Sequence, residues 1–286
     1  DVRTGRWGRA ADQNQAAIAA HRAYERRSPR QDLYRAYMFH NDHFLAYACM
    51  MEGRERDARA AARAMIDSIP EQFYRDYAPV ADAYSAIEVE SLMRFGRWDD
   101  ILALPQPRAE LPITRALWRF ARAVSLAAKG DAPAARAEQR LFRTQAAAIP
   151  PEAMMAVNPA RTVLALADEM LEGEILYREG DIPGAVRHLR AAVEIEDSLR
   201  YIEPPDWVQP VRHALGAVLL DAGRPADAEA GYREDLRRWP ENGWALFGLA
   251  QSLRAQGRDA EAAPLDARFQ KAWQRADTTL AASCFC

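Results

Sequence analysis

The chain has 286 residues, of which 49% are hydrophobic and 28% are charged, so its composition is that of a folded protein rather than a disordered one. The formal net charge of −3 favours neither nucleic acid nor an anionic membrane as a partner. The sequence contains no run of about 18 apolar residues, so we expect no transmembrane segment.

An internal repeat organises the sequence. Residues 215–224 (LGAVLLDAGR) recur in character at residues 249–258 (LAQSLRAQGR), an offset of 34 residues that is the tetratricopeptide period. In each unit a first helix ends at a glycine, because glycine tolerates the left-handed conformation that often ends a helix. The second helix carries a small residue where the helices cross and an aromatic one turn later, here Ala228 and Tyr232, and Pro240 ends it.

Glycines followed by arginine or aspartate mark the predicted turns along the whole chain. In chain order they are Gly5, Gly53, Gly96, Gly130, Gly180, Gly223 and Gly257. Their spacings are 48, 43, 34, 50, 43 and 34 residues, and the longer ones predict extended loops between repeats. Only four residues precede Gly5, too few for a first helix, and the given sequence starts at Asp1 without a charged-then-apolar signal peptide. We therefore expect an array that begins within a repeat.

These patterns predict the fold class. We expect an all-α, tetratricopeptide-like, right-handed superhelical solenoid of about six to seven helix-turn-helix units over residues 1–280, with a cysteine-containing tail at 281–286. No stretch alternates with a period of two, so we predict no sheet. Two prolines stiffen residues 203–207 (EPPDW), where Asp206 is expected to cap a helix that starts at Trp207. The alternative is that this loop presents both residues at a repeat junction.

Several segments carry a family resemblance. Residues 203–207, 210–212, 232–236 and 240–244 resemble the C-terminal half of a bacterial tetratricopeptide-repeat family of unassigned activity, and so do residues 39–45 and 51–54. The resemblance implies a parent chain of roughly twice this length, whose missing N-terminal half is rich in histidine. It also implies an exported, periplasmic protein. The scarcity of lysine beside abundant arginine fits the coding bias of a GC-rich bacterium.

The resemblance also implies a set of ligand-binding positions. In tetratricopeptide proteins, positions 2, 5, 9 and 12 of each first helix face the concave groove. Counted back from the turn glycines, these positions give the groove residues His40, His43, Tyr47, Met50, Glu90, Met93, Glu174, Tyr177, His213 and Trp244. His40 and His43 are three residues apart and so share one helical face. The alternative for this pair is a role in the core or in capping a loop.

A transition-metal site is the second interpretation of these residues. His40, His43, Cys284 and Cys286 together offer imidazole and thiolate ligands that suit copper, zinc or iron, with redox chemistry as a further option. A pair of cysteines without a second pair is also what an incidental chain end gives. Cys49 is expected to be a small buried residue.

Three functional hypotheses remain open from the sequence. The first is a binding or scaffold protein that holds a peptide, a protein or a small ligand in its concave groove. The second is a metal-binding helical-repeat protein, and the third is a structural scaffold with an inert groove. The sequence has no phosphate-binding loop, dinucleotide fingerprint, nucleophile elbow or zinc-protease motif, so an enzyme would need a site assembled across repeats.

Overall fold

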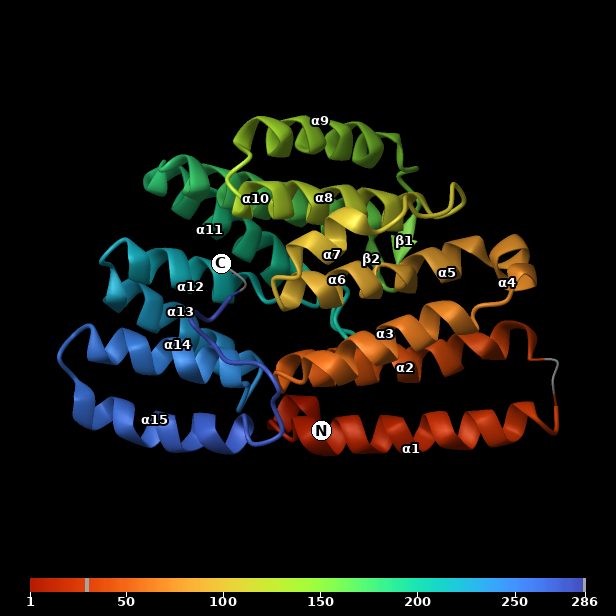
Figure 1. Cartoon of the computed structure of the whole chain (residues 1–286), viewed down its shortest axis with the longest axis horizontal. Coiled ribbons are helices and arrows are strands. Elements are labelled where there is room, and N and C mark those ends of the chain that lie inside the picture. The colour runs from red at the N-terminus through yellow and green to blue at the C-terminus, as the bar shows by residue number, and fades with distance from the viewer. Residues whose placement is uncertain (29–30, 285–286) are drawn as a thin grey trace.

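The computed structural model describes residues 1–28 and 31–284 and is mostly helical (Figure 1). The first part of the chain forms η1 (Val2–Thr4), α1 (Trp7–Glu25), η2 (Asp32–Tyr34), α2 (Arg35–Met51), α3 (Glu55–Ser68), α4 (Glu71–Asp76), α5 (Ala78–Ser85), α6 (Ile87–Arg94), α7 (Trp98–Ala103), α8 (Pro112–Ala128) and α9 (Ala132–Ala148). The second part forms β1 (Met154–Met155), β2 (Asn158–Pro159), α10 (Ala160–Glu179), α11 (Ile182–Ser198), α12 (Val211–Asp221), α13 (Pro225–Arg238), α14 (Gly243–Arg254) and α15 (Asp259–Ala272).

The predicted turn glycines are confirmed. All seven have a positive φ, between 63° and 87°, a region that favours glycine because it has no Cβ. Six of them join the helix pairs α2–α3, α6–α7, α8–α9, α10–α11, α12–α13 and α14–α15, and the members of each pair contact one another. The predicted aromatic, Tyr232, is fully buried against Gly216 and Gly248, where a Cβ would lie 2.3 Å from its ring.

Neighbouring pairs pack in series, which is the expected all-α repeat architecture. In Figure 1 the chain climbs from α1 and α2 at the bottom to α9 at the top, and then returns through α10 to α13. It ends with α14 and α15 at the bottom, beside its starting point. Each step is supported by direct contact, including α3 with α6, α6 with α8, α8 with α10, α11 with α12 and α13 with α14.

The first and last units touch, and we call this contact the closing seam. Several hydrogen bonds cross it, among them Trp7 Nε1 to Pro240 O (2.9 Å), Trp244 Nε1 to Met50 O (3.0 Å) and Glu55 N to Asp277 Oδ1 (2.6 Å). The ring of Trp273 also covers Gly53, so closely that a Cβ on this glycine would lie 2.2 Å from it. The array is therefore closed on itself, and its inner side chains pack against other helices of the same chain.

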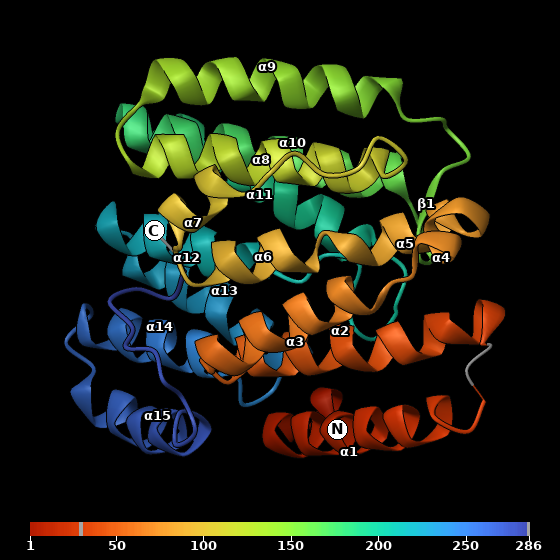
Figure 2. The same cartoon turned by 45° about the vertical axis from the view of Figure 1, so that its right-hand side comes forward.

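The prediction that the chain contains no sheet is wrong in one small respect. Strands β1 and β2 form an antiparallel pair of two residues each, and β1 contacts α5 (Figure 2). Asp206 holds this hairpin, because its carboxylate accepts hydrogen bonds from the backbone N–H groups of Val157 (3.3 Å) and Asn158 (3.0 Å). Asp206 therefore does not cap a helix at Trp207, and α12 begins only at Val211. Strands this short leave no periodic signal in a sequence.

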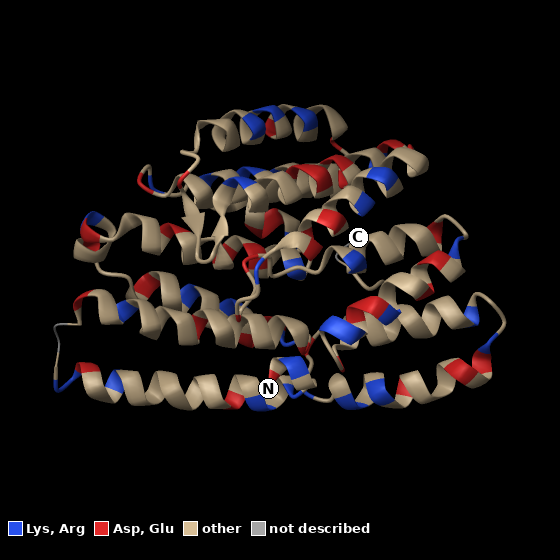
Figure 3. Cartoon of the chain, turned by 180° about the vertical axis from the view of Figure 1, so that it is seen from behind, with Lys and Arg blue, Asp and Glu red and all other residues tan. Residues whose placement is uncertain are grey.

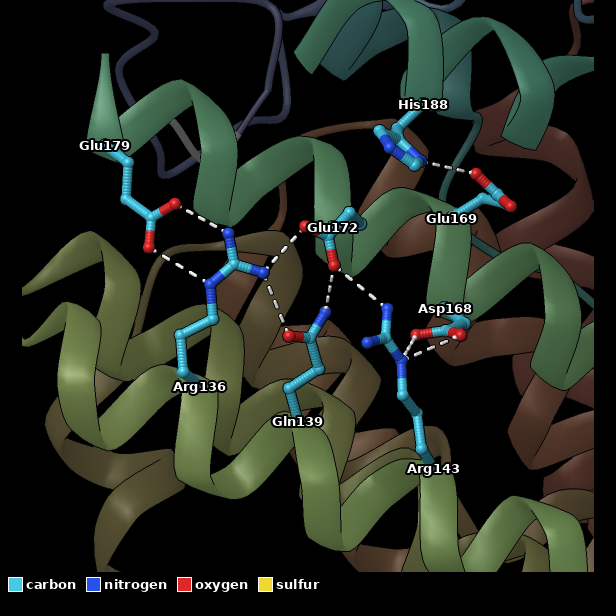
Figure 4. A network of polar contacts seen from close by, with 8 residues as sticks. All are labelled: Arg136, Gln139, Arg143, Asp168, Glu169, Glu172, Glu179 and His188. Atoms are coloured by element: carbon cyan, nitrogen blue, oxygen red, sulfur yellow. Dashed lines mark hydrogen bonds and ion pairs between the residues drawn. The ribbon is translucent and has the colours of Figure 1, made fainter. Parts of the chain in front are cut away.

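Ion pairs connect α9 to α10 on the outside of the array (Figure 4). Arg136 donates to Glu172 (2.7 Å) and Glu179 (2.6 Å), while Arg143 donates to Asp168 (2.7 Å) and Glu172 (2.9 Å). The helix α9 buries few large apolar side chains, so this network adds to the packing of an outer helix. Figure 3 shows basic and acidic residues interspersed along the helices. None of the helices within the described ranges is long and apolar enough to cross a membrane.

Candidate functional site

Most of the predicted groove residues lie in the interior of the closed array. Tyr47, Met50, Met93, His213 and Trp244 are at most 1% exposed. Because the first and last units meet, the inner positions of the first helices face other helices instead of solvent. These five side chains are therefore closed off by the chain itself and do not line an open groove.

His213 and Trp244 belong to a buried polar network. His213 Nδ1 lies 3.0 Å from Arg94 Nη2, and since a guanidinium only donates, Nδ1 accepts and Nε2 donates to Asp235 (2.9 Å). Asn242 also donates to Asp235 (3.0 Å), and the Arg94 guanidinium lies 3.7 Å from the centre of the Trp244 ring. Burial lowers the pKa of Arg94 to about 9. Each member of the network has a partner within it, which gives it a structural role.

His40 and His43 both line a small cavity. They extend from α2 toward Tyr84 of α5, Glu90 of α6 and residues 202–206, and Met155 and Ala156 complete the wall. His43 is 7% exposed and its Nδ1 has no hydrogen-bond partner within the described part of the chain. Its ring packs edge-on against Tyr84, with 5.4 Å between the ring centres.

Both ionisable groups deepest in this His43–Glu90 cavity are uncharged near neutral pH. Burial, followed by the nearby charge of Asp206, raises the pKa of Glu90 to about 8. Burial, followed by the nearby His40, lowers the pKa of His43 to about 3. The Glu90 carboxyl makes no hydrogen bond to any described residue. The cavity therefore presents a neutral imidazole and a protonated carboxyl, and both can donate and accept hydrogen bonds.

A larger cleft adjoins this cavity at Tyr84. The two share Ala83, Tyr84 and Ala156, and the cleft has a volume of about 620 Å³. It lies between α5, the start of α8 and residues 150–156, and its lining is largely apolar, including Val80, Pro112, Ile113 and Met154. The apolar cleft therefore lies directly beside the polar cavity, whose own volume is only about 10 Å³, with three lining residues in common.

The remaining predicted site residues lie elsewhere. Glu174 is buried in α10, and Tyr177 of the same helix donates a hydrogen bond to Asp221 (3.1 Å). Cys284 is buried in the larger hydrophobic core, and Cys286 lies outside the described residues. Within residues 1–28 and 31–284, no three or more His, Cys, Asp or Glu side chains are grouped so that they could hold a metal ion. The copper, zinc or iron site stays a prediction.

Sequence reasoning missed the partners of the histidines. Nothing in the pattern indicates Tyr84, whose place at the mouth of the cavity depends on how α5 packs beside α2. The one part of the cavity wall that the sequence marks is the stiff loop at 203–207, although its role is to support the β1–β2 hairpin and to line the cavity.

No protein-family model matches the chain, and no curated protein matches it.

Proposed function

We propose that this chain is a ligand-binding helical-repeat protein, and that the cleft and the His43–Glu90 cavity hold one ligand between them. An apolar part of the ligand fills the cleft, and an uncharged polar group reaches His43 and Glu90. The ligand is a small molecule or a peptide side chain. The proposal includes a tetratricopeptide-type, right-handed superhelix, as the glycine-marked helix pairs suggest.

The unpaired Nδ1 of His43 carries this proposal. A buried polar side-chain atom without a partner costs about 1–3 kcal/mol. The described residues have eleven such atoms, and His43 Nδ1 is the one whose residue lines this cavity. Here the unpaired atom belongs to a residue that lines a cavity, and Glu90, whose carboxyl has no hydrogen-bond partner among the described residues, lines the same cavity. A cleft of about 620 Å³ with an apolar lining and a few convergent polar groups has the size and character of a typical ligand site.

The charge state of the cavity favours a neutral polar group. A ligand carboxylate would meet Glu203 and Asp206 in the same wall, and it would find no cation among the lining residues. A carboxamide or a hydroxyl group can accept from the Glu90 carboxyl and donate to the imidazole without transferring charge into a buried space. We therefore expect aliphatic or aromatic amides and alcohols as ligands.

A fragment screen by thermal shift tests the proposal. The screen compares aromatic amides with the matching carboxylates and amines, first on the wild-type chain and then on His43→Ala. The control variant is His188→Ala, which removes an imidazole that pairs with Glu169 on the outer helices, away from the cavity. We expect amides that stabilise the wild type and His188→Ala, and that lose their effect on His43→Ala.

Two further substitutions cover the case in which His43→Ala unfolds. Both are at the junction where the cleft meets the cavity: Ala83→Leu narrows this junction, whereas Tyr84→Phe keeps the aromatic ring there and removes only its hydroxyl group. We expect bound amides to lose affinity in Ala83→Leu and to keep most of it in Tyr84→Phe. The absence of any stabilising amide or alcohol, or binding that is unaffected by both His43→Ala and Ala83→Leu, would reject the proposal.

A further inference from the structure

A second cavity, of about 80 Å³, shares Ile202, Pro205 and Asp206 with the His43–Glu90 cavity, but its character is different. Its lining brings four arginines together from separate parts of the chain: Arg3 from η1, Arg200 from the loop after α11, Arg212 from α12 and Arg238 from the end of α13. Such a concentration of guanidinium groups is notable in a chain whose formal net charge is −3.

Carboxylates pair with three of the four arginines of this arginine cavity and leave Arg200 unpaired among the described residues. Arg238 donates to Glu234 (2.9 Å), and Arg3 forms a longer ion pair with Glu203 (3.9 Å). Asp197 serves two arginines at once, since it accepts both guanidinium N–H groups of Arg212 (2.8 and 2.7 Å) and lies 2.9 Å from Arg238. Arg200 is exposed, and its side chain pairs with no described residue. Glu196 is in the wall, but burial, followed by the nearby charge of Asp235, raises its pKa to about 8. Glu196 therefore adds little negative charge at neutral pH.

Aromatic rings and a helix end fix the geometry. The Arg3 guanidinium lies over two rings, 4.5 Å from the centre of Tyr201 and 4.3 Å from that of Trp239. It also donates to the backbone carbonyl of Arg238 (3.1 Å), which sets its position across the closing seam. Arg212 lies in the first turn of α12, where the positive end of the helix dipole adds to the field of its guanidinium.

We propose that the arginine cavity binds a small oxyanion, either a phosphate or a carboxylate group. Arg200, which pairs with no described residue, makes the main contact. Arg3, whose ion pair with Glu203 is 3.9 Å long, makes the second, while Arg212 and Arg238 lie behind them in their pairs with Asp197 and Glu234. The volume suits a single such group, since it equals the space of roughly two to three water molecules. This site is separate from the proposed amide-binding cavity, and it takes an anionic group where that cavity takes an uncharged one.

Calorimetric titration of the full chain tests the inference. Inorganic phosphate and succinate are titrated separately at constant ionic strength, and the tighter of the two identifies the source of the oxyanion. The test variant is Arg200→Gln, which leaves the fold intact because this side chain is exposed and holds no other group in place. Arg140→Gln is the matched control, because Arg140 is also exposed, makes no side-chain pair with a described residue and lies on α9.

We expect Arg200→Gln to weaken binding by about tenfold or more, since a hydrogen bond to a charged group contributes that much affinity. Arg140→Gln should bind like the wild type, and Arg3→Gln should weaken binding as Arg200→Gln does. Equal losses in the Arg200 and Arg140 variants would reveal only a diffuse charge effect and would overturn the inference. Failure of both phosphate and succinate to bind the wild type would overturn it as well.

Discussion

Glu90→Gln gives the sharpest test of the electrostatics of the His43–Glu90 cavity. A glutamate in an unfolded chain loses its proton near pH 4.5, whereas folded Glu90 keeps its proton up to about pH 8. Between these two values the folded state binds more protons than the unfolded state, so stability falls as the pH rises. The slope is about 1.4 kcal/mol per pH unit, which gives about 3 kcal/mol at pH 7. Glutamine has nearly the same shape and carries no charge at any of these pH values.

We therefore expect Glu90→Gln to gain stability over the wild type as the pH rises. The difference in the free energy of unfolding should be smallest near pH 4, grow to about 3 kcal/mol at pH 7 and level off above about pH 8. Urea unfolding followed by circular dichroism across this range measures it. Glu194→Gln is the control, since Glu194 is exposed on α11 and its difference should stay flat. A constant difference between Glu90→Gln and the wild type from pH 4 to above pH 8 would refute a protonated, buried Glu90.

Other substitutions test the seam and the buried network. Gly53→Ala and Gly223→Ala both place a side chain at a positive φ, of 70° and 67°, but only the first collides with Trp273. We expect Gly53→Ala to cost about 2 kcal/mol more in urea unfolding, and equal costs would contradict the described contact. Asn242→Ala removes a helix cap and a partner of the buried network, so it should cost about 2–3 kcal/mol, against about 1 kcal/mol for loss of the α9 cap in Asp131→Ala. Elemental analysis of untagged protein tests the copper, zinc or iron prediction, which requires stoichiometric metal that is lost when both α2 histidines become alanine.

The turns and the helix crossings within each repeat could be predicted from the sequence, because each requires a particular type of residue at a particular position. Gly180 and Gly223 occupy left-handed turns where a side chain would be strained, so glycine itself reports the turn. Tyr232 needs a small residue on each flanking helix, and Gly216 and Gly248 supply them. These requirements recur with the repeat and therefore leave a periodic trace.

The closing seam could not be predicted in this way. Trp244 donates to the carbonyl of Met50, which is 194 residues away, and no repeat pattern specifies such a pairing. The consequence for the site is large, because closure turns an expected groove surface into core. His40 and His43 still line a cavity, because this cavity lies beside the β1–β2 hairpin rather than at the closing seam. The support of that hairpin by Asp206 also leaves no pattern in the sequence.

Closure of the array changes how the chain is expected to unfold. In an open row of repeats the terminal units have one neighbour each, so they fray first and unfolding proceeds piece by piece. Here the outermost helices α1 and α15 are held through contacts with the opposite end of the chain, such as Arg275 with Asp12 (2.8 Å) and the Trp273 ring on Gly53. Amide protons in the terminal units should therefore exchange about as slowly as those in the middle. The chain should lose its structure in one cooperative step, and contacts between its most distant segments should slow its folding, because closing a long loop costs entropy.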